Sequence, residues 1–240
     1  MNLLAIDTST KQLGVAARRD ERLVASYDAL GELTHAVELP AVVTRVLQAA
    51  QMTLQDIEAI AVDIGPGSFT GLRIGLSFVK ALAFPRRIPV VGVPSMDVLA
   101  SQVPFLSGTV CVVLDAKQKN VYGALYQLED GRITRHSDYL LGPVDRLLSL
   151  ITRPTIFLGD GCALYWPQII ERCPQAQPAD AELSWPRAST LARLGVERFA
   201  QDRQEDAGRL VPLYLYPQDC QVRSATRTTS VLPDPTPTPS

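Results

Sequence analysis

A glycine-rich segment is the part of this sequence whose residue types and spacing could most directly support chemistry. It reads Gly65-Pro-Gly-Ser-Phe-Thr-Gly-Leu-Arg-Ile-Gly75 and lies between an apolar run over 59–64, typical of a strand, and a run over 72–84, typical of a helix. A loop that leads into a helix N-terminus can bind an anion, because unpaired backbone N–H groups point outward there. Gly71 and Gly75, four residues apart, share one helix face and would let a second backbone approach closely. The segment therefore predicts either a phosphate site or a close helix contact.

The order of strand-like and helix-like runs is the same in both halves of the chain. The first half contains three strands, a helix, a strand and a helix, expected over 3–6, 13–17, 23–27, 39–50, 59–64 and 72–84. The second half repeats this order over 109–114, 121–127, 133–136, 145–151, 155–158 and 166–173, with a further helix over 191–200. In each half an acid, Asp7 or Asp115, follows the first strand. The repeat β-β-β-α-β-α predicts an α/β protein of two similar lobes, with ligands at the strand ends between them.

Length and composition set the expected domains and exclude several classes of protein. We expect residues 1–103 to form the first lobe, 104–225 the second, and the Pro/Thr-rich stretch 226–240 to be a disordered tail. A net charge of −2 leaves no overall basic excess for binding nucleic acid. The four cysteines form no C-x-x-C pair, which argues against a zinc site. No apolar run reaches transmembrane length and the N-terminus lacks the basic region of a signal peptide, so a cytoplasmic location is expected.

Several motifs together resemble the TsaB (YeaZ) family. They are Ala5-Ile-Asp-Thr-Ser9, the glycine segment 65–75, Pro89-Val-Val-Gly-Val93, Leu114-Asp-Ala116 and Pro212-Leu-Tyr-Leu215. The resemblance covers residues 1 to about 216 and implies an actin-like, sugar-kinase-type (ASKHA) fold. It also implies a role in forming N6-threonylcarbamoyladenosine at the adenosine next to the anticodon of certain tRNAs.

The resemblance further implies a set of partners. Members of this family are non-catalytic subunits that pair with the catalytic paralogue TsaD, and the ATPase TsaE completes the complex. Contact with tRNA is then expected through the complex, ATP or ADP is a candidate ligand at its interface, and no cofactor is assigned to this chain. A homodimer is expected when the partner is absent, and no membrane contact is expected.

One stretch tests the non-catalytic interpretation. The catalytic relatives follow the equivalent strand with N-H-x-x-G-H, whose two histidines hold a metal. Here the stretch is Val93-Pro-Ser-Met-Asp-Val-Leu99, so Ser95 and Leu99 stand at the ligand positions. A hydroxyl and an aliphatic side chain cannot replace two imidazoles at such a metal. The chain has only two histidines, His35 and His136, and we predict neither a metal site nor a catalytic residue.

The resemblance implies that the first two helices pack against the equivalent helices of the partner. The predicted partner interface consists of one histidine, two glycines and six apolar residues: His35, Leu39, Val42, Val43, Val46, Gly71, Gly75, Phe78 and Leu82. Two alternatives stay open. The second helix could be enclosed within its own lobe, and His35 could be a helix-capping residue with a satisfied hydrogen bond.

A residual nucleotide site is a further hypothesis, and it involves residues from both strand ends: Asp7, Thr8, Ser9, Asp115, Gly159 and Gly161. Kinases of this fold usually carry a glycine in the first turn, but Asp7-Thr-Ser-Thr10 has none, so Asp7 could also be a turn former. The competing function is a small-molecule kinase of the same fold, similar to type III pantothenate kinase. Such a kinase would turn over ATP with Mg²⁺ and would need that glycine.

Overall fold

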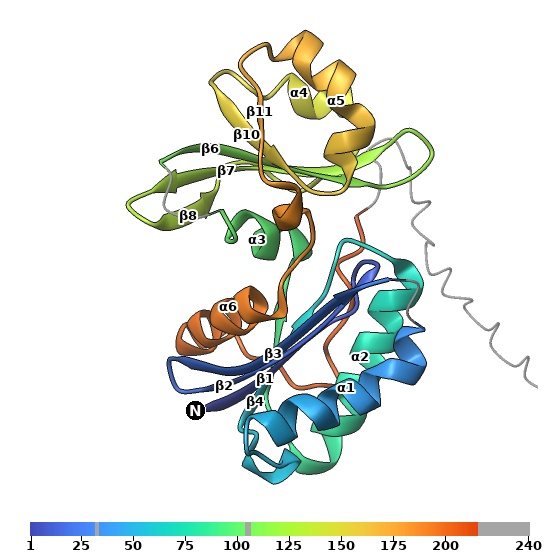
Figure 1. The fold of residues 1–240 in the computed structure, drawn as a ribbon, viewed down its shortest axis with the longest axis vertical. Coiled ribbons are helices and arrows are strands. Elements are labelled where there is room, and N and C mark those ends of the chain that lie inside the picture. The colour runs from blue at the N-terminus through green and yellow to red at the C-terminus, as the bar shows by residue number, and fades with distance from the viewer. Residues whose placement is uncertain (32–33, 104–106, 216–240) are drawn as a thin grey trace, which may run out of the picture.

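The first half of the chain folds around a five-stranded sheet with the strand order β3-β2-β1-β4-β5. Its strands are β1 (Asn2–Asp7), β2 (Gln12–Arg19), β3 (Arg22–Leu30), β4 (Ala59–Asp63) and β5 (Val90–Val93). Strands β1, β4 and β5 are parallel, and β2 and β3 add to them as antiparallel strands. Helices α1 (His35–Ala49) and α2 (Phe69–Ala83) cover one face of the sheet (Figure 1). This computed structural model describes residues 1–31, 34–103 and 107–215, so the predicted disordered tail lies outside the described residues.

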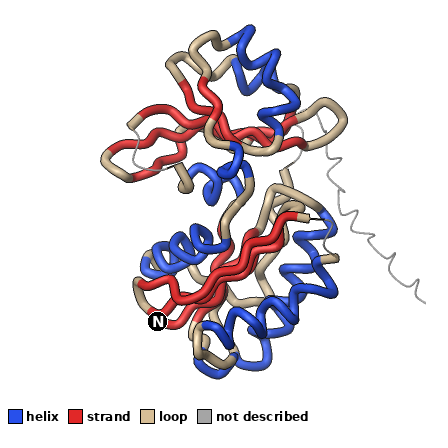
Figure 2. Tube along the Cα trace, viewed as in Figure 1, coloured by secondary structure: helices blue, strands red, loops and turns tan. Residues whose placement is uncertain are grey.

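The second half repeats this arrangement around a six-stranded sheet with the order β11-β10-β6-β7-β8, and β9 pairs with β7. Its elements are β6 (Gly108–Asp115), β7 (Val121–Glu129), β8 (Arg132–Arg135), β9 (Leu140–Gly142), α4 (Val144–Leu148), β10 (Thr155–Leu158), α5 (Gly161–Arg172) and β11 (Gln177–Pro178). The alternation of strands and helices stands out in Figure 2. The predicted fold class, two α/β lobes of similar order, is confirmed.

Helix α6 (Ala188–Ala200) covers the other face of the first sheet, although it follows the second lobe in sequence (Figure 1). Its buried residues share a core with β1 and β4. The packing is close, since a Cβ added to Gly195 would lie 2.5 Å from the Cβ of Ala61. The helix start is fixed by Asp28 on β3, which accepts a hydrogen bond of 2.8 Å from the backbone N–H of Ala188. The lobe boundary at residue 103 stays a prediction. Helix α6 lies near the C-terminal end of the described chain but packs on the sheet of the first lobe.

Helix α3 (Ser95–Ala100) is shared by the two lobes. Val98 packs into the core between α6 and the first sheet, whereas Met96 and Leu99 pack into the core of the second lobe. Asp97 of the same helix accepts hydrogen bonds from Tyr126 and Tyr139 of the second lobe. One short helix therefore holds contacts to both cores.

The last described residues return to the first lobe and then reach the second. Glu205 forms a bridge with Val90, and the backbone N–H of Leu213 donates to the carbonyl of Ile64 at 2.7 Å. Leu210 is buried with α1 and α2, and Leu215 packs against the core of the second lobe. Within the described residues, no helix is long and apolar enough to cross a membrane.

The close packing of α6 can be tested by adding a side chain. We expect Gly195→Val to lower the free energy of unfolding by about 1–3 kcal/mol, because the new methyl groups meet Ala61 and Leu3. Ala200→Val, at an exposed position of the same helix, should change it by less than about 0.5 kcal/mol. Urea denaturation measures both, and equal effects would show that the α6 packing is looser than described.

Candidate functional site at the strand ends and on helices α1 and α2

The glycine segment packs against the turn that follows β1. The parallel register of β1 and β4 pairs Ile6 with Val62, which brings the two strand ends together. The backbone N–H of Ser68 donates to the carbonyl of Ser9 at 2.7 Å, and a Cβ on Gly67 would lie 2.2 Å from that same oxygen. The Ser68 hydroxyl accepts a hydrogen bond from the N–H of Gly71 and so caps α2. The close backbone contact that the sequence predicted is therefore made within the lobe.

Thr8 occupies the glycine face of α2. A Cβ on Gly71 would lie 2.1 Å from the Thr8 carbonyl oxygen, and one on Gly75 would lie 2.3 Å from the Thr8 hydroxyl oxygen. That hydroxyl donates to the carbonyl of Gly71 at 2.8 Å. The space beside these two glycines is filled by the chain's own first turn, so their contact with a partner stays a prediction that their surroundings do not support. A substitution at Gly75 tests folding of the lobe rather than binding.

Four other predicted interface residues are also core residues. Leu39, Val42, Val43 and Val46 are buried between α1 and the first sheet, so they have no surface to offer a partner. The predicted amphipathic stripe of α1 is confirmed. It packs against the first sheet of its own lobe, whereas the prediction had it facing a partner. The alternative that the helices are enclosed by their own lobe holds for these residues and for both glycines.

The outer faces of α1 and α2 nevertheless carry apolar side chains. Val37 on α1 is 70% exposed, and Phe69 and Phe84 at the two ends of α2 are 54% and 71% exposed. Phe78 and Leu82, both predicted interface residues, are half-buried at the edge of the core. Leu82 lines an apolar pocket of about 280 Å³ at the C-terminal end of α2. These residues form the surface that we name the outer α1–α2 face.

His35 begins α1 and ties it to the first turn. A ring nitrogen, Nε2, lies 2.8 Å from the Thr10 carbonyl oxygen and donates to it, because a carbonyl oxygen only accepts. The alternative of a hydrogen-bonded histidine at the helix start is supported by this bond, which reaches the turn after β1 and does not cap α1. Its role in a partner contact stays a prediction.

Two buried acids end the neighbouring strands β1 and β4. The carboxyls of Asp7 and Asp63 are each 1% exposed. Asp7 accepts a hydrogen bond of 2.7 Å from the N–H of Ser9, in agreement with its interpretation as a turn former. Asp63 accepts from the N–H of Gly65 at 2.7 Å and from the Ser95 hydroxyl at 2.5 Å. Sequence analysis missed Asp63, although its place after a buried strand matches that of Asp7.

Burial dominates the electrostatics of these two acids. It raises the pKa of Asp7 well above the ordinary value for a carboxyl, and the neighbouring Asp63 raises it further. Burial also raises the pKa of Asp63, to about 7, against the opposing effect of its hydrogen bonds from Ser95 and Gly65. Near neutral pH the folded protein therefore holds protons here that an exposed pair of aspartates would have released.

The second-lobe residues of the predicted nucleotide site also close on their own lobe. Asp115 forms an ion pair of 2.5 Å with Lys117, and its N–H donates to the side chain of Asp160. A Cβ on Gly159 would lie 2.3 Å from the carbonyl oxygen of Val113, and one on Gly161 would lie 3.0 Å from that oxygen. Both glycines thus let the turn after β10 approach β6. The nucleotide site stays a hypothesis without an open glycine face to support it.

The metal positions of the catalytic relatives are filled by other contacts. The Ser95 hydroxyl donates to Asp63, and Leu99 is buried in the core of the second lobe. Neither side chain fits a metal ion, and within the described residues no group of three or more His, Cys, Asp or Glu could hold one.

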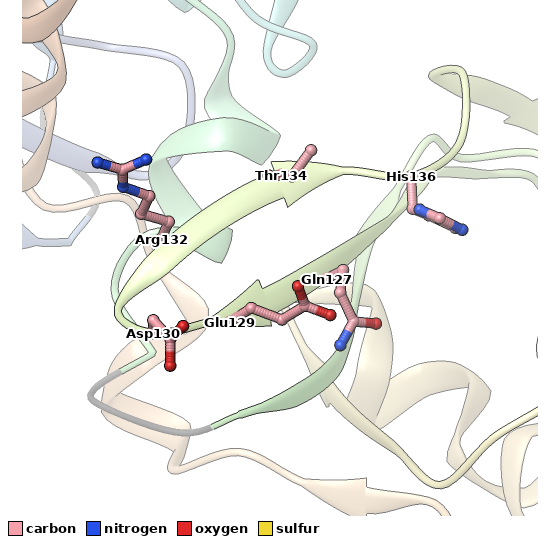
Figure 3. A pocket seen from close by; sticks show the side chains of 6 residues that line it. All are labelled: Gln127, Glu129, Asp130, Arg132, Thr134 and His136. Carbon is pink, nitrogen blue, oxygen red and sulfur yellow. The ribbon is translucent and has the colours of Figure 1, made fainter.

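A larger hollow, about 640 Å³, lies on the β7–β8 hairpin. Six polar side chains line it: Gln127, Glu129, Asp130, Arg132, Thr134 and His136. Figure 3 shows that they point away from the two strands in several directions and do not converge on one point. The hollow lacks the convergent polar groups of a ligand site.

Similarity to known proteins covers nearly the whole chain. The TsaB protein of Bacillus subtilis (strain 168), described as a tRNA threonylcarbamoyladenosine biosynthesis protein, is 34% identical over 90% of this chain and 94% of its own length. The TsaB protein of Escherichia coli (strain K12) is 28% identical over the same shares. The solved structure of YeaZ from Pseudomonas aeruginosa is 31% identical, has a TM-score of 0.78, and is matched over 89% of this chain and 99% of its own.

The chain belongs to the TsaB family.

The relation of the TsaB family to TsaD is visible as well. The family model of TsaD, tRNA N6-adenosine threonylcarbamoyltransferase, matches residues 30–203. A protein of that description from Geobacter sulfurreducens is 35% identical, but over only 40% of this chain and 33% of its own length. The chain therefore shares the TsaD architecture, and the TsaB relatives match it over a much greater length.

The contact between Thr8 and α2 can be tested by a double-mutant cycle. We expect Gly75→Ala to cost about 1–3 kcal/mol, because its Cβ meets the Thr8 hydroxyl. Adding Thr8→Ala removes that hydroxyl and should recover at least about 1 kcal/mol relative to the sum of the single changes. Urea denaturation of the four proteins gives the coupling free energy.

Gly71→Ala is the matched control, since its Cβ meets the Thr8 backbone carbonyl, which Thr8→Ala leaves in place. No recovery is expected in that pair. Recovery in both pairs, or in neither, would contradict the described packing of the first turn on α2.

Proposed function

We propose that this chain is a non-catalytic subunit of the machinery that forms N6-threonylcarbamoyladenosine in tRNA, and that it binds a TsaD-like catalytic subunit through the outer α1–α2 face. Membership of the TsaB family supports the pathway, because curated members carry the description tRNA threonylcarbamoyladenosine biosynthesis protein. The observation that supports the binding surface is the set of exposed apolar side chains on two neighbouring helices, Val37, Phe69 and Phe84 foremost. Exposed apolar side chains on neighbouring helices are the kind of surface that protein interfaces use.

The outer α1–α2 face combines small and large apolar residues, as a helix-on-helix contact requires. Small exposed residues, Ala36 and Ala41 on α1 and Ala81 on α2, leave room for partner side chains beside the larger apolar groups. The pocket beside Leu82 offers a place for one apolar anchor. His35 lies at the start of α1, at the edge of this face. Of the predicted interface residues, we keep His35, Phe78 and Leu82 in the proposal.

The non-catalytic role is supported by the chemistry around Ser95 and Leu99, which does not fit a metal. It is also supported by the first turn. Thr8 fills the space beside Gly71 and Gly75 of α2, where a phosphate would otherwise approach. The competing proposal, a small-molecule kinase, needs a glycine in that turn and an open phosphate loop. Neither requirement is met in Asp7-Thr-Ser-Thr10.

The other partners follow from the same proposal. A TsaE-like ATPase would join the pair, tRNA would be bound by the complex as a whole, and ATP or ADP would bind at the subunit interface. The free chain would pair with a second copy through the same apolar face. We place this machinery in the cytoplasm, where tRNA is modified.

A charge placed on the outer α1–α2 face should break the complex. We expect Val37→Glu to weaken binding to the TsaD-like subunit of the same organism at least tenfold, because a carboxylate would be desolvated against apolar partner groups. The control is Leu164→Glu, which puts the same charge near the start of helix α5 at a residue that is 62% exposed. Calorimetric titration measures both affinities.

Unchanged binding of the Val37→Glu variant would show that the interface lies on another surface.

ATP turnover separates the two proposed functions, since the isolated chain with Mg²⁺ and ATP should release no more ADP than a buffer blank. Turnover by the isolated chain would favour the kinase.

A further inference from the structure

Helix α3 is held by polar contacts in its first turn. At its start the Ser95 hydroxyl donates to Asp63 of β4, and the Ser95 N–H donates to the carbonyl of Gly65. Two residues on, Asp97 forms an ion pair of 2.6 Å with Arg198 of α6. The other oxygen of Asp97 accepts from Tyr126 and Tyr139 of the second lobe, at 2.8 and 2.7 Å. The position of α3 therefore sets how the two lobes meet.

The first of these fastenings rests on an unusual charge arrangement. Asp7 and Asp63 are both fully enclosed, and one carboxyl oxygen of each, Oδ2, has no hydrogen-bond partner. Every donor that reaches the pair is neutral: the backbone N–H groups of Ser9 and Gly65, and the Ser95 hydroxyl.

The charged groups that act on the pair are further acids. Asp28 on β3 acts on Asp7, and Asp97 on α3 acts on Asp63. Arg198 is paired with Asp97, and His35 on α1 is hydrogen-bonded to Thr10. Within the described residues, therefore, nothing positive compensates the two carboxyls.

We propose that the enclosed carboxyls of Asp7 and Asp63 retain protons at neutral pH and act as a pH-sensitive latch on α3. Two enclosed carboxylates with only neutral donors cannot both be ionised at modest cost, whereas a bound proton removes a charge. This protonation keeps the ends of β1 and β4 together. It thereby holds the glycine segment and Ser95, both of which are bonded to Asp63.

The alternative occupant is a metal ion, and the site suits it poorly. Hard cations in proteins take about six or more oxygen ligands, or keep bound waters. The two orphan oxygens and the Ser9 hydroxyl supply about half that number, and the enclosure leaves no route for waters to complete it. A proton needs only the two oxygens.

The direction of the pH effect follows from the raised pKa values of the pair. A carboxyl whose pKa is raised on folding binds its proton more tightly in the folded state, so its protonation stabilises the fold fully below the unfolded pKa of about 4. That contribution is lost as the pH rises toward the folded pKa of Asp63, about 7. Above it Asp63 carries an enclosed negative charge that no cation compensates, which weakens its hold on the start of α3.

The test compares the wild type with Asp63→Asn between pH 5.5 and 8.5. The amide is neutral at every pH and can donate to Asp7. We expect the urea midpoint of the wild type to fall more steeply than that of Asp63→Asn as the pH rises toward 7, because two buried carboxyls release protons on unfolding in the wild type and only Asp7 does so in the variant. Above pH 7 the two profiles should run parallel. Asp115→Asn is the matched control, because Asp115 ends the equivalent strand of the second lobe but is paired with Lys117. Its pH profile should follow the wild type.

A second measurement needs no substitution and so covers the case in which Asp63→Asn does not fold. Carbon NMR of the wild type with ¹³C-labelled aspartate should show one carboxyl that titrates near pH 7. Hydrogen exchange at residues 95–98, corrected for its intrinsic pH dependence, should rise above pH 7 in the wild type only.

Three results would overturn the latch. They are a flat wild-type profile, titration of every aspartate below about pH 5, and loss of the pH dependence on adding Mg²⁺, Na⁺ or K⁺. The last result would assign the site to a cation.

Discussion

The contact of the first turn with α2 is the constraint on which the rest of the first lobe depends. Thr8 lies against the helix backbone because Gly71 and Gly75 have no side chains there. This close approach draws the glycine segment onto Ser9 and places the ends of β1 and β4 side by side. The enclosure of Asp7 and Asp63, and the anchoring of Ser95, follow from that arrangement.

The same kind of closure occurs at the strand ends of both lobes. In each lobe, glycines at a strand end let the chain close on itself: Gly67 on Ser9 in the first, Gly159 on Val113 in the second. The backbone groups that a phosphate would need are then occupied by internal contacts. What remains exposed is the outer surface of the helices, in line with the proposed association with a catalytic subunit.

The sequence was sufficient for the order of elements, since hydrophobic period and turn residues are local properties. It also predicted that the face of Gly71 and Gly75 receives a close contact. It could not say which element fills that face, because a bare helix surface accepts Thr8 of the same chain as readily as a partner. Asp63 was missed because a lone acid after a strand is usually a turn former, and its burial depends on the register of β1 and β4. Likewise, the sequence pattern assigned no role to Asp97, which lies in the stretch that lacks the histidine pair. Its three hydrogen-bond partners are far away in sequence.

The path of the chain through the two lobes has a consequence for synthesis. The strands and helices over 108–178 form the second sheet from one continuous stretch, so this lobe can fold as soon as that stretch has left the ribosome. The first sheet is made earlier but lacks α6 on one face, and Leu210 on the other, until the end of the described chain emerges. One face of its apolar strands β1 and β4 therefore stays without α6 until late in translation. The lobe that is synthesised first is the one completed last, and nascent chains are most open to chaperones and to aggregation at that sheet.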